Sequence, residues 1–161
     1  MKRNGKDRLG EAVVTFLGLG KLPIAPGTWG TLGAALVHAI VATRIGTASH
    51  PYILPGLAAA FTLLCLVACP WAERFYGRKD PSPFVIDEVA GYFLVVSFFP
   101  QHRQLLVSIL AFFLFRVFDV IKPPPARRFE ALPAGIGIVT DDLVAGLYAA
   151  LCIWLALMIF T

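Results

Sequence analysis

The acidic residues of this chain are concentrated in one stretch, and their spacing could assemble a cation site. Seven of the ten lie between positions 80 and 142, although long apolar runs surround them. Charge in or near hydrocarbon is costly, so such residues are candidates for function. Six of the seven form three groups: Asp80 with Asp87 and Glu88, then Asp119 beside Arg116 and Lys122, then Asp141 with Asp142.

Two of these groups are followed by glycines at helical spacing. Asp87 precedes Gly91 and Asp142 precedes Gly146, and each glycine ends a Val-Ala-Gly sequence. Residues four apart share one face of a helix, and a glycine on that face lets another backbone approach closely. The pattern predicts two helices that pack together and bring their acids to one point.

A third pattern combines both signs of charge near the end of an apolar helix. Arg116, Asp119 and Lys122 lie at positions i, i+3 and i+6, just before the proline run 123–125 that ends the helix. Two interpretations stay open. The three side chains could form a salt-bridge ladder that anchors the helix end. Alternatively, Asp119 binds a metal ion while Arg116 and Lys122 hold a phosphate, as at many phosphoryl sites.

A turn rich in glycine and proline opens another apolar helix at Gly27-Thr28-Trp29-Gly30-Thr31. The free N–H groups of a helix start, together with the hydroxyls of Thr28 and Thr31, could bind an anion there. No Gly-Lys-Ser/Thr sequence follows the glycines, so this is not a P-loop. A helix cap with a tight turn, and with Trp29 at the membrane interface, explains the residues equally well.

The last acidic group follows a glycine-rich segment, 135–140, which we expect to be a flexible turn that leads to Asp141 and Asp142 at a helix start. Acids there complement the helix dipole, so capping could explain one of them. Adjacent residues differ by about 100° around a helix, so the two acids need not contact one ion. Two metal ions, or one ligand and one base, both stay open.

Apolar segments must position these groups in a membrane. Hydrophobic residues make up 58% of the 161 residues, and the mean hydropathy of +0.75 is well above that of soluble proteins. Four stretches, 29–45, 52–72, 105–121 and 143–160, approach or reach the length of a span, and a shorter fifth, 89–99, can extend back to residue 84. We expect one all-α domain over 1–161, an integral membrane helical bundle of about four to five spans. Its N-terminal segment, 9–20, is expected to be interfacial or re-entrant.

Basic residues predict the orientation of this bundle. With the N-terminus in the cytoplasm and five spans, twelve Lys and Arg residues fall inside and only Arg44 and Arg103 outside, which agrees with the positive-inside rule. The same threading places all ten acids on the cytoplasmic side, and His38, His50 and His102 in or toward the other half. The chemistry is therefore expected at the cytoplasmic face, without histidine.

This set of groups limits the possible chemistry. Carboxylates without histidine or thiolate suit Mg²⁺ better than Zn²⁺ or copper, and Mg²⁺ beside Arg and Lys indicates a phosphate ligand. The phosphohistidine and phosphocysteine routes are disfavoured, which leaves a metal-activated water or a carboxylate nucleophile. The alternative function is a small ion or solute transporter that uses intramembrane acids, although a transport path would need polar groups through the membrane depth. A non-catalytic lipid-binding scaffold would need basic residues and no acid cluster.

Four segments give the chain a family resemblance over roughly residues 16–150. They are Pro23-Ile24-Ala25-Pro26-Gly27-Thr28-Trp29-Gly30, the segment from Asp80-Pro81 to Asp87-Glu88-Val89-Ala90-Gly91, Phe115-Arg116-Val117-Phe118-Asp119-Val120-Ile121-Lys122-Pro123, and Gly135-Ile136-Gly137-Ile138-Val139-Thr140-Asp141-Asp142-Leu143-Val144-Ala145-Gly146. Together and in this order they resemble the phosphatidylglycerophosphatase A family. One departure is Ala134-Gly135, where the family usually has two glycines.

The resemblance implies a multi-pass, Mg²⁺-dependent lipid phosphatase of the bacterial inner membrane, which converts phosphatidylglycerophosphate to phosphatidylglycerol and phosphate in phospholipid biosynthesis. Its partners would be this phospholipid and membrane lipids, without nucleic acid, and the oligomeric state stays open. We expect catalytic roles for Asp80, Asp87, Asp119 and Asp142. The expected metal ligands are Asp87, Glu88, Asp119, Asp141 and Asp142, and the expected phosphate-binding residues are Gly27, Thr28, Thr31, Arg116 and Lys122.

Overall fold

The protein is a bundle of helices in a computed structural model that describes residues 5–124, 126–129, 132 and 135–160. Within these residues every regular element is helical, as the sequence predicts. In chain order they are α1 (Gly5–Val14), the 3₁₀ turn η1 (Leu19–Lys21), α2 (Pro26–Arg44), the 3₁₀ turn η2 (Thr47–Ser49), α3 (His50–Tyr76), α4 (Ile86–Ser97), α5 (Gln104–Ile121), α6 (Ala126–Phe129) and α7 (Gly135–Phe160).

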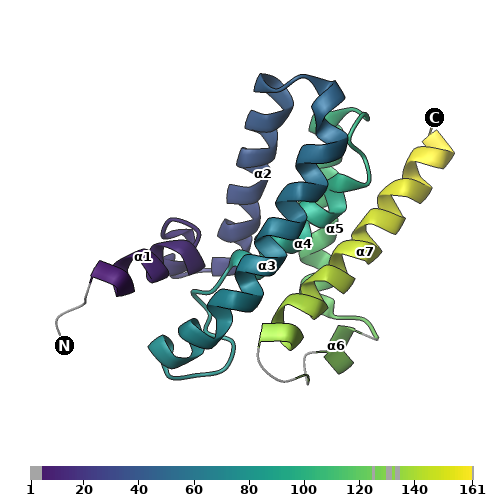
Figure 1. Cartoon of the computed structure of the whole chain (residues 1–161). Coiled ribbons are helices and arrows are strands. Elements are labelled where there is room, and N and C mark those ends of the chain that lie inside the picture. The colour runs from purple at the N-terminus through teal and green to yellow at the C-terminus, as the bar shows by residue number, and fades with distance from the viewer. Residues whose placement is uncertain (1–4, 125, 130–131, 133–134, 161) are drawn as a thin grey trace.

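The long helices run up and down, as Figure 1 shows. The helices α2, α4 and α7 begin at one end of the bundle, where α3 and α5 finish and the short α6 lies. We call this the site end, and the opposite end, with the α2–α3 and α4–α5 connections, the far end. The positive-inside count assumed the same alternation of helix directions. This alternation brings the segments with acidic motifs to a common end.

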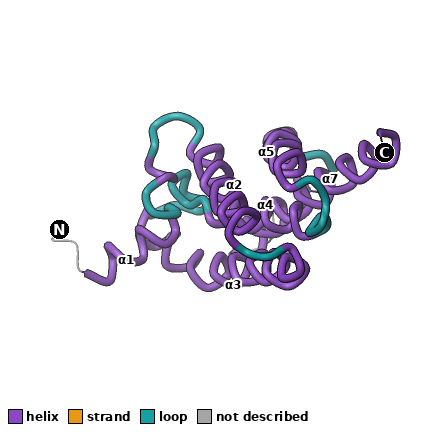
Figure 2. The backbone as a smooth tube through the Cα atoms, turned by 90° about the horizontal axis from the view of Figure 1, so that it is seen from above, coloured by secondary structure: helices purple, strands orange, loops and turns teal. Residues whose placement is uncertain are grey.

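Helix α4 occupies the centre of the bundle. Viewed from above in Figure 2, it lies among α2, α3, α5 and α7, and it contacts all four. Nine of its twelve residues are buried, including Tyr92 and Phe93. The apolar segment after Asp87 and Glu88 is therefore a core helix, and the two acids at its start are carried into the middle of the site end.

Three helices are long and apolar enough to cross a membrane within the described residues. They are α3 with the preceding η2, then α5, then α7 up to Ile159. They expose large apolar side chains such as Leu63, Val67 and Val120, as expected for surfaces that face lipid. The expected number of four to five spans is not confirmed: α2 is not among the three, and α4 measures only about 18 Å at 1.5 Å per residue.

The N-terminal segment lies at one side of the bundle near the site end, with α1 roughly perpendicular to α2 in Figure 1. Gly10 of α1 rests on the indole ring of Trp71 in α3, where an added Cβ would approach the ring to 2.6 Å. Leu9 and Leu17 are exposed on this segment. A crosswise helix with exposed leucines suits the membrane interface, and the interfacial position of this segment stays a prediction.

Candidate active site

The first acids of the site stand at the start of α4. Asp87 and Glu88 lie in its first turn, and the backbone N–H of Glu88 donates a hydrogen bond to Asp87 Oδ1 at 3.1 Å. The segment before the helix is tied to the N-terminal region, because the N–H of Val85 donates to the carbonyl oxygen of Val14 at 3.0 Å. Between Pro81 and Phe84 that segment forms a turn, which is closed by the Phe84 N–H donating to the carbonyl oxygen of Pro81 at 2.7 Å. The start of α4 is thereby held in place.

The predicted crossing of two acid-bearing helices is confirmed. A Cβ added to Gly146 of α7 would lie 2.9 Å from the carbonyl oxygen of Gly91 in α4, so the two backbones touch where both residues lack a side chain. One turn away, carboxylate oxygens of Asp87, Glu88 and Asp142 lie within 4.8 Å of one another. The structure thus brings acids from sequence positions 87 and 142 to one place.

The two adjacent acids of α7 separate, as their angular spacing requires. Asp142 joins the group on α4, whereas Asp141 Oδ2 lies 2.6 Å from Lys122 Nζ. The expectation of a flexible turn before these acids was wrong. Helix α7 already begins at Gly135, and Asp141 lies in its second turn. Gly135 packs so closely on Cys69 of α3 that a Cβ would come within 2.6 Å, and this packing outweighs the weak helix preference of glycine.

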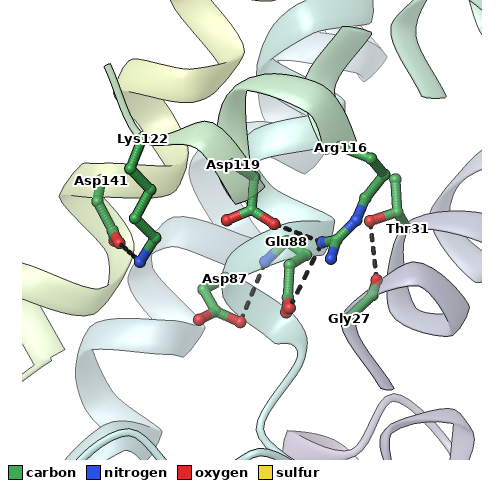
Figure 3. Close-up of polar contacts among 8 residues, drawn as sticks. All are labelled: Gly27, Thr31, Asp87, Glu88, Arg116, Asp119, Lys122 and Asp141. Carbon is green, nitrogen blue, oxygen red and sulfur yellow. Dashed lines mark hydrogen bonds and ion pairs between the residues drawn. The ribbon is translucent and has the colours of Figure 1, made fainter. Parts of the chain in front are cut away.

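Arg116 connects α5 to the acids of α4. Its Nη1 atom lies 2.6 Å from Asp119 Oδ2 and 3.7 Å from Glu88 Oε1, as Figure 3 shows. The predicted pairing of Arg116 with Asp119 along α5 is therefore present. Lys122 does not continue that ladder: α5 ends at Ile121, Lys122 adopts a left-handed conformation with φ of 48°, and its side chain pairs with α7.

The start of α2 closes the site from a third side. Gly27 is packed against Glu88 and Arg116, so that an added Cβ would overlap Glu88 Oε1 and lie 2.9 Å from Arg116 Nη1. The structure places Thr28 and Thr31 outside the lining of the cavity. The Thr31 hydroxyl is buried and donates to the carbonyl oxygen of Gly27 at 2.9 Å within the helix. Close backbone approach at Gly27 is what this motif contributes to the observed site.

These groups surround one cavity of about 260 Å³ at the site end. All of the predicted acids line it, including Asp80, which has a positive φ of 49°. Sequence reasoning missed Ser82, whose hydroxyl accepts a hydrogen bond from Arg78. Ser82 lies between two prolines and two residues after Asp80, and this position could have indicated that it lines the site. The full lining is Ala25, Pro26, Gly27, Asp80, Ser82, Phe84, Asp87, Glu88, Arg116, Asp119, Lys122, Ile138, Asp141 and Asp142.

The carboxylates of the cavity are held in an unfavourable electrostatic state. Burial, with the Glu88 and Asp142 carboxylates nearby, raises the pKa of Asp87 well above its usual range. Burial also raises the pKa of Glu88 to about 7. Among the described residues, no group donates a hydrogen bond to the buried atoms Glu88 Oε2 and Asp142 Oδ2. Such orphaned acceptors are costly in a protein interior, and a bound cation would satisfy them.

The donor set fits a hard divalent cation and a phosphate. All candidate ligands are carboxylate oxygens, which Mg²⁺ prefers, and two cationic side chains border them. The described residues that line the cavity include neither histidine nor cysteine. The arrangement can therefore hold a cation among Asp87, Glu88 and Asp142 and present Arg116 and Lys122 to an anion beside it.

Comparisons with known proteins identify the family of the chain. The model of the phosphatidylglycerophosphatase A family matches residues 12–157. Proteins named phosphatidylglycerophosphatase A from Haemophilus influenzae and Escherichia coli are 35% and 31% identical over 138 and 135 residues, which cover 85% and 83% of this chain and 82% and 74% of theirs.

A third relative, from Bacteroides thetaiotaomicron, carries the provisional name phosphatidylinositol-3-phosphatase. It is 33% identical over 143 residues, 88% of this chain and 89% of its own. No solved structure matches the chain. The family match over nearly the whole sequence shows that the chain belongs to the phosphatidylglycerophosphatase A family, a family of phosphoric monoester hydrolases.

Proposed function

We propose that this chain hydrolyses the terminal phosphate of phosphatidylglycerophosphate, with Mg²⁺ as cofactor, and so supplies phosphatidylglycerol in phospholipid biosynthesis. The observation that carries the proposal is the meeting of Asp87, Glu88 and Asp142 with Arg116 and Lys122 around one cavity. The substrate comes from two relatives, which are named for it. The enzyme class follows from the family.

The charge of the cavity supports a divalent cofactor. Among the described residues, six acids and two basic residues line it, so full ionisation of these groups leaves a formal excess of four negative charges. A phosphate monoester is itself a dianion near neutral pH, and such a cavity would repel it. One bound Mg²⁺ would reduce the excess to two negative charges and two ions would cancel it, so either number is compatible with the cavity. When bound, the cofactor would polarise the phosphoryl oxygens and lower the pKa of a water molecule.

The residues would divide the remaining work by position. Asp87, Glu88 and Asp142 would hold the cation, with Asp119 and Asp141 beside them as the next carboxylates of the lining. Arg116 and Lys122 would bind phosphoryl oxygens and neutralise charge in the transition state. Their present pairing with Asp119 and Asp141 keeps both cationic groups directed at the cavity.

The reaction transfers the phosphoryl group from a lipid alcohol to water. The bond between the terminal phosphorus and the glycerol oxygen breaks, a water oxygen joins the phosphorus, and the glycerol oxygen takes up a proton. A carboxylate of the cavity can accept the proton that the water loses. Water can attack the phosphorus directly, or an Asp carboxylate can attack it first. Only the carboxylate route forms an acyl-phosphate intermediate, which hydroxylamine would trap.

We further place the enzyme in the bacterial inner membrane with its site toward the cytoplasm. The three relatives are bacterial, and three apolar helices are compatible with a membrane protein. At the site end the described basic residues are numerous, for example Arg78, Lys79 and Arg127, whereas Arg44 and Arg103 mark the far end. The positive-inside rule assigns the richer end to the cytoplasm.

A phosphate-release assay on the purified protein in detergent tests the proposal. We expect hydrolysis of phosphatidylglycerophosphate with Mg²⁺ and none after chelation. Arg116→Gln should lower kcat/KM by about 10²–10³-fold, the usual loss for one group that stabilises the transition state. The matched control is Arg127→Gln, an exposed arginine of α6 outside the cavity lining.

The outcomes are distinct. Absence of phosphate release from this lipid by the wild-type protein would overturn the proposed activity. Higher kcat/KM on phosphatidylinositol-3-phosphate would move the substrate to the one in the name of the Bacteroides relative. Full activity of the chelated protein would remove Mg²⁺ from the proposal, and ion flux without hydrolysis would favour the transporter alternative.

A further inference from the structure

An apolar groove runs along α2 beside the active-site cavity. Only apolar atoms line it, and its volume is about 500 Å³. Three of its side chains, Trp29, Leu32 and Leu36, are between 39% and 64% exposed on one stripe of the helix. Its lining is Leu19, Trp29, Leu32, Gly33, Ala35 and Leu36, and we call it the α2 groove.

The wall of the α2 groove is built by an unusual turn. Phe16 and Leu17 both have positive φ, of 45° and 59°, a conformation that costs a non-glycine residue roughly 1 kcal/mol or more. The turn brings η1 back onto α2, where Leu19 and Phe16 cover Gly33. An added Cβ at Gly33 would lie 2.5 Å from Leu19 and 2.9 Å from Phe16. The missing side chain thus lets Leu19 form one wall while the adjacent helix surface stays open.

The α2 groove and the cavity share one helix. Pro26 and Gly27 in the first turn of α2 line the cavity, and Trp29, three residues after Pro26, begins the groove. The indole N–H of Trp29 donates to the carbonyl oxygen of Ile24 at 2.9 Å, which holds the ring near the loop. The first turns of α2 therefore border both the polar cavity and the apolar groove, although none of the described residues lines both.

The length of this stretch of α2 matches one leaflet of a membrane. Pro26 and Leu36 are ten residues apart, which is about 15 Å along a helix. The hydrocarbon core of a bilayer is about 30 Å thick, so one leaflet occupies roughly half of that. A lipid whose phosphate lies in the cavity would have its acyl chains extending in the same direction as the groove.

From this closeness along α2 and the matching length we infer that the α2 groove holds an acyl chain of the same lipid whose phosphate occupies the cavity. The inference rests on the proposed function for its substrate class and adds a second binding region to it. The groove would orient the lipid by its tail, while Arg116 and the cation would act on its head. A bound chain would increase the affinity for long-chain substrates and leave the chemistry of the phosphate unchanged.

A second groove provides a matched control. It has a volume of about 410 Å³ and includes Leu147, Leu151 and Trp154 of α7 with Phe98 and Phe99 after α4. It lies toward the far end, because α4 finishes there. Leu32 and Leu151 are similarly exposed, at 45% and 51%. Leu32→Trp and Leu151→Trp therefore make the same change in an apolar groove next to the cavity and in one remote from it.

The first test compares long-chain with dihexanoyl phosphatidylglycerophosphate in detergent. We expect Leu32→Trp to raise the KM for the long-chain lipid at least about fivefold, equivalent to lost burial of one or two methylene groups, with little effect on the short-chain lipid. Leu151→Trp should change neither KM. Equal changes for both lipids, or equal changes in both variants, would overturn the inference.

The second test is independent of catalysis and of the folding of any variant. The wild-type protein in vesicles is photolabelled with a phosphatidylglycerophosphate that carries a diazirine on its acyl chain, and the labelled residues are mapped. We expect labelling concentrated at 29–36, reduced by excess unlabelled substrate, and absent with a phosphatidylcholine probe. Equal labelling by both probes would mean that ordinary membrane lipid fills the groove, and would overturn the inference. Because labelling needs binding alone, its outcome is separate from the phosphate-release result that decides the proposed activity.

Discussion

The two ends of the bundle both bury polar side chains, but they satisfy them differently. At the far end, His38 of α2, Tyr92 of α4 and Gln104 of α5 form one hydrogen-bonded chain. His38 Nε2 lies 2.8 Å from Gln104 Oε1, and His38 Nδ1 lies 3.1 Å from the Tyr92 hydroxyl. The hydroxyl of Ser108 lies 2.7 Å from that of Tyr92. At the site end, by contrast, carboxylates face one another across the cavity.

The direction of each far-end hydrogen bond follows from the donors available. The Gln104 amide nitrogen donates to the carbonyl oxygens of Phe99 and His102, so its oxygen is left to accept from His38. His38 Nδ1 must then accept from Tyr92, which in turn accepts from Ser108. Every member has a partner without any ligand. Among the described residues of the site end, Glu88 Oε2 and Asp142 Oδ2 have no such partner, so the comparison separates a network that is complete within the fold from one that, under the proposed function, a bound cation would complete.

The largest expected effect comes from Asp142 of α7, whose Oδ2 atom has no hydrogen-bond partner among the described residues. Asp142→Asn keeps the shape of the side chain and removes one negative charge from the group with Asp87 and Glu88. We expect kcat/KM for phosphate release to fall at least about 10³-fold, about 4 kcal/mol of transition-state stabilisation. Thermal stability without Mg²⁺ should stay equal or rise, because like-charge repulsion is reduced. Asp7→Asn, at an acid of α1 outside the cavity lining, is the control and should retain activity. Normal turnover by Asp142→Asn would remove this residue from the site.

The next effect concerns Mg²⁺ and the thermal stability of the wild-type protein. A ligand that binds only the folded state adds about 2.7 kcal/mol at a concentration of 100 times its Kd. We therefore expect Mg²⁺ to raise the Tm of the wild-type protein in detergent, measured by tryptophan fluorescence, and to have little effect on Asp142→Asn. An equal increase in both proteins would place the ion elsewhere.

The third effect tests the helix crossing that assembles the acids. Gly146→Ala would put a methyl group 2.9 Å from the carbonyl oxygen of Gly91, so α4 and α7 must move apart. We expect a loss of about 2 kcal/mol in the free energy of unfolding, as for overpacked cores, together with reduced phosphate release. Gly56→Ala in α3 is the control, because no atom lies within 4 Å of its added Cβ. If Gly146→Ala lowered neither the free energy of unfolding nor phosphate release, the close helix crossing would not be required to bring the acids together.

Local sequence patterns predict much of this fold. Apolar stretches and breaking prolines locate α2, α3 and α5 to within a few residues of their observed ends. The start of α7 was missed because Gly135 and Gly137 favour a turn locally, and only the packing of Gly135 on Cys69 reveals that the helix already includes them. The number of membrane spans also depends on tertiary packing, because the apolar helix α4 is buried among other helices and is too short to span alone.

The site could be predicted in part, because some of its contacts follow from local residue spacing. The spacing from Asp87 to Gly91 and from Asp142 to Gly146 is a property of single helices, so the crossing was accessible to sequence reasoning. The partner of Lys122 was not, because the chain leaves the helix at that residue and its side chain turns to α7. A pairing that begins beyond a helix end depends on tertiary packing, which local spacing does not encode.

The smallest expected effect belongs to the closed network of the far end. Tyr92→Phe removes the hydroxyl that donates to His38 and leaves a buried ring nitrogen without a donor. We expect the free energy of unfolding to fall by about 1–2 kcal/mol, the cost of an unsatisfied buried acceptor, while phosphate release and the Mg²⁺-dependent increase in Tm stay near wild type. Tyr52→Phe is the control, since this tyrosine is 80% exposed and its hydroxyl should contribute little. If Tyr92→Phe abolished activity without loss of stability, the two ends would be coupled in function, and the distinction between a stabilising network and a ligand-completed one would fail.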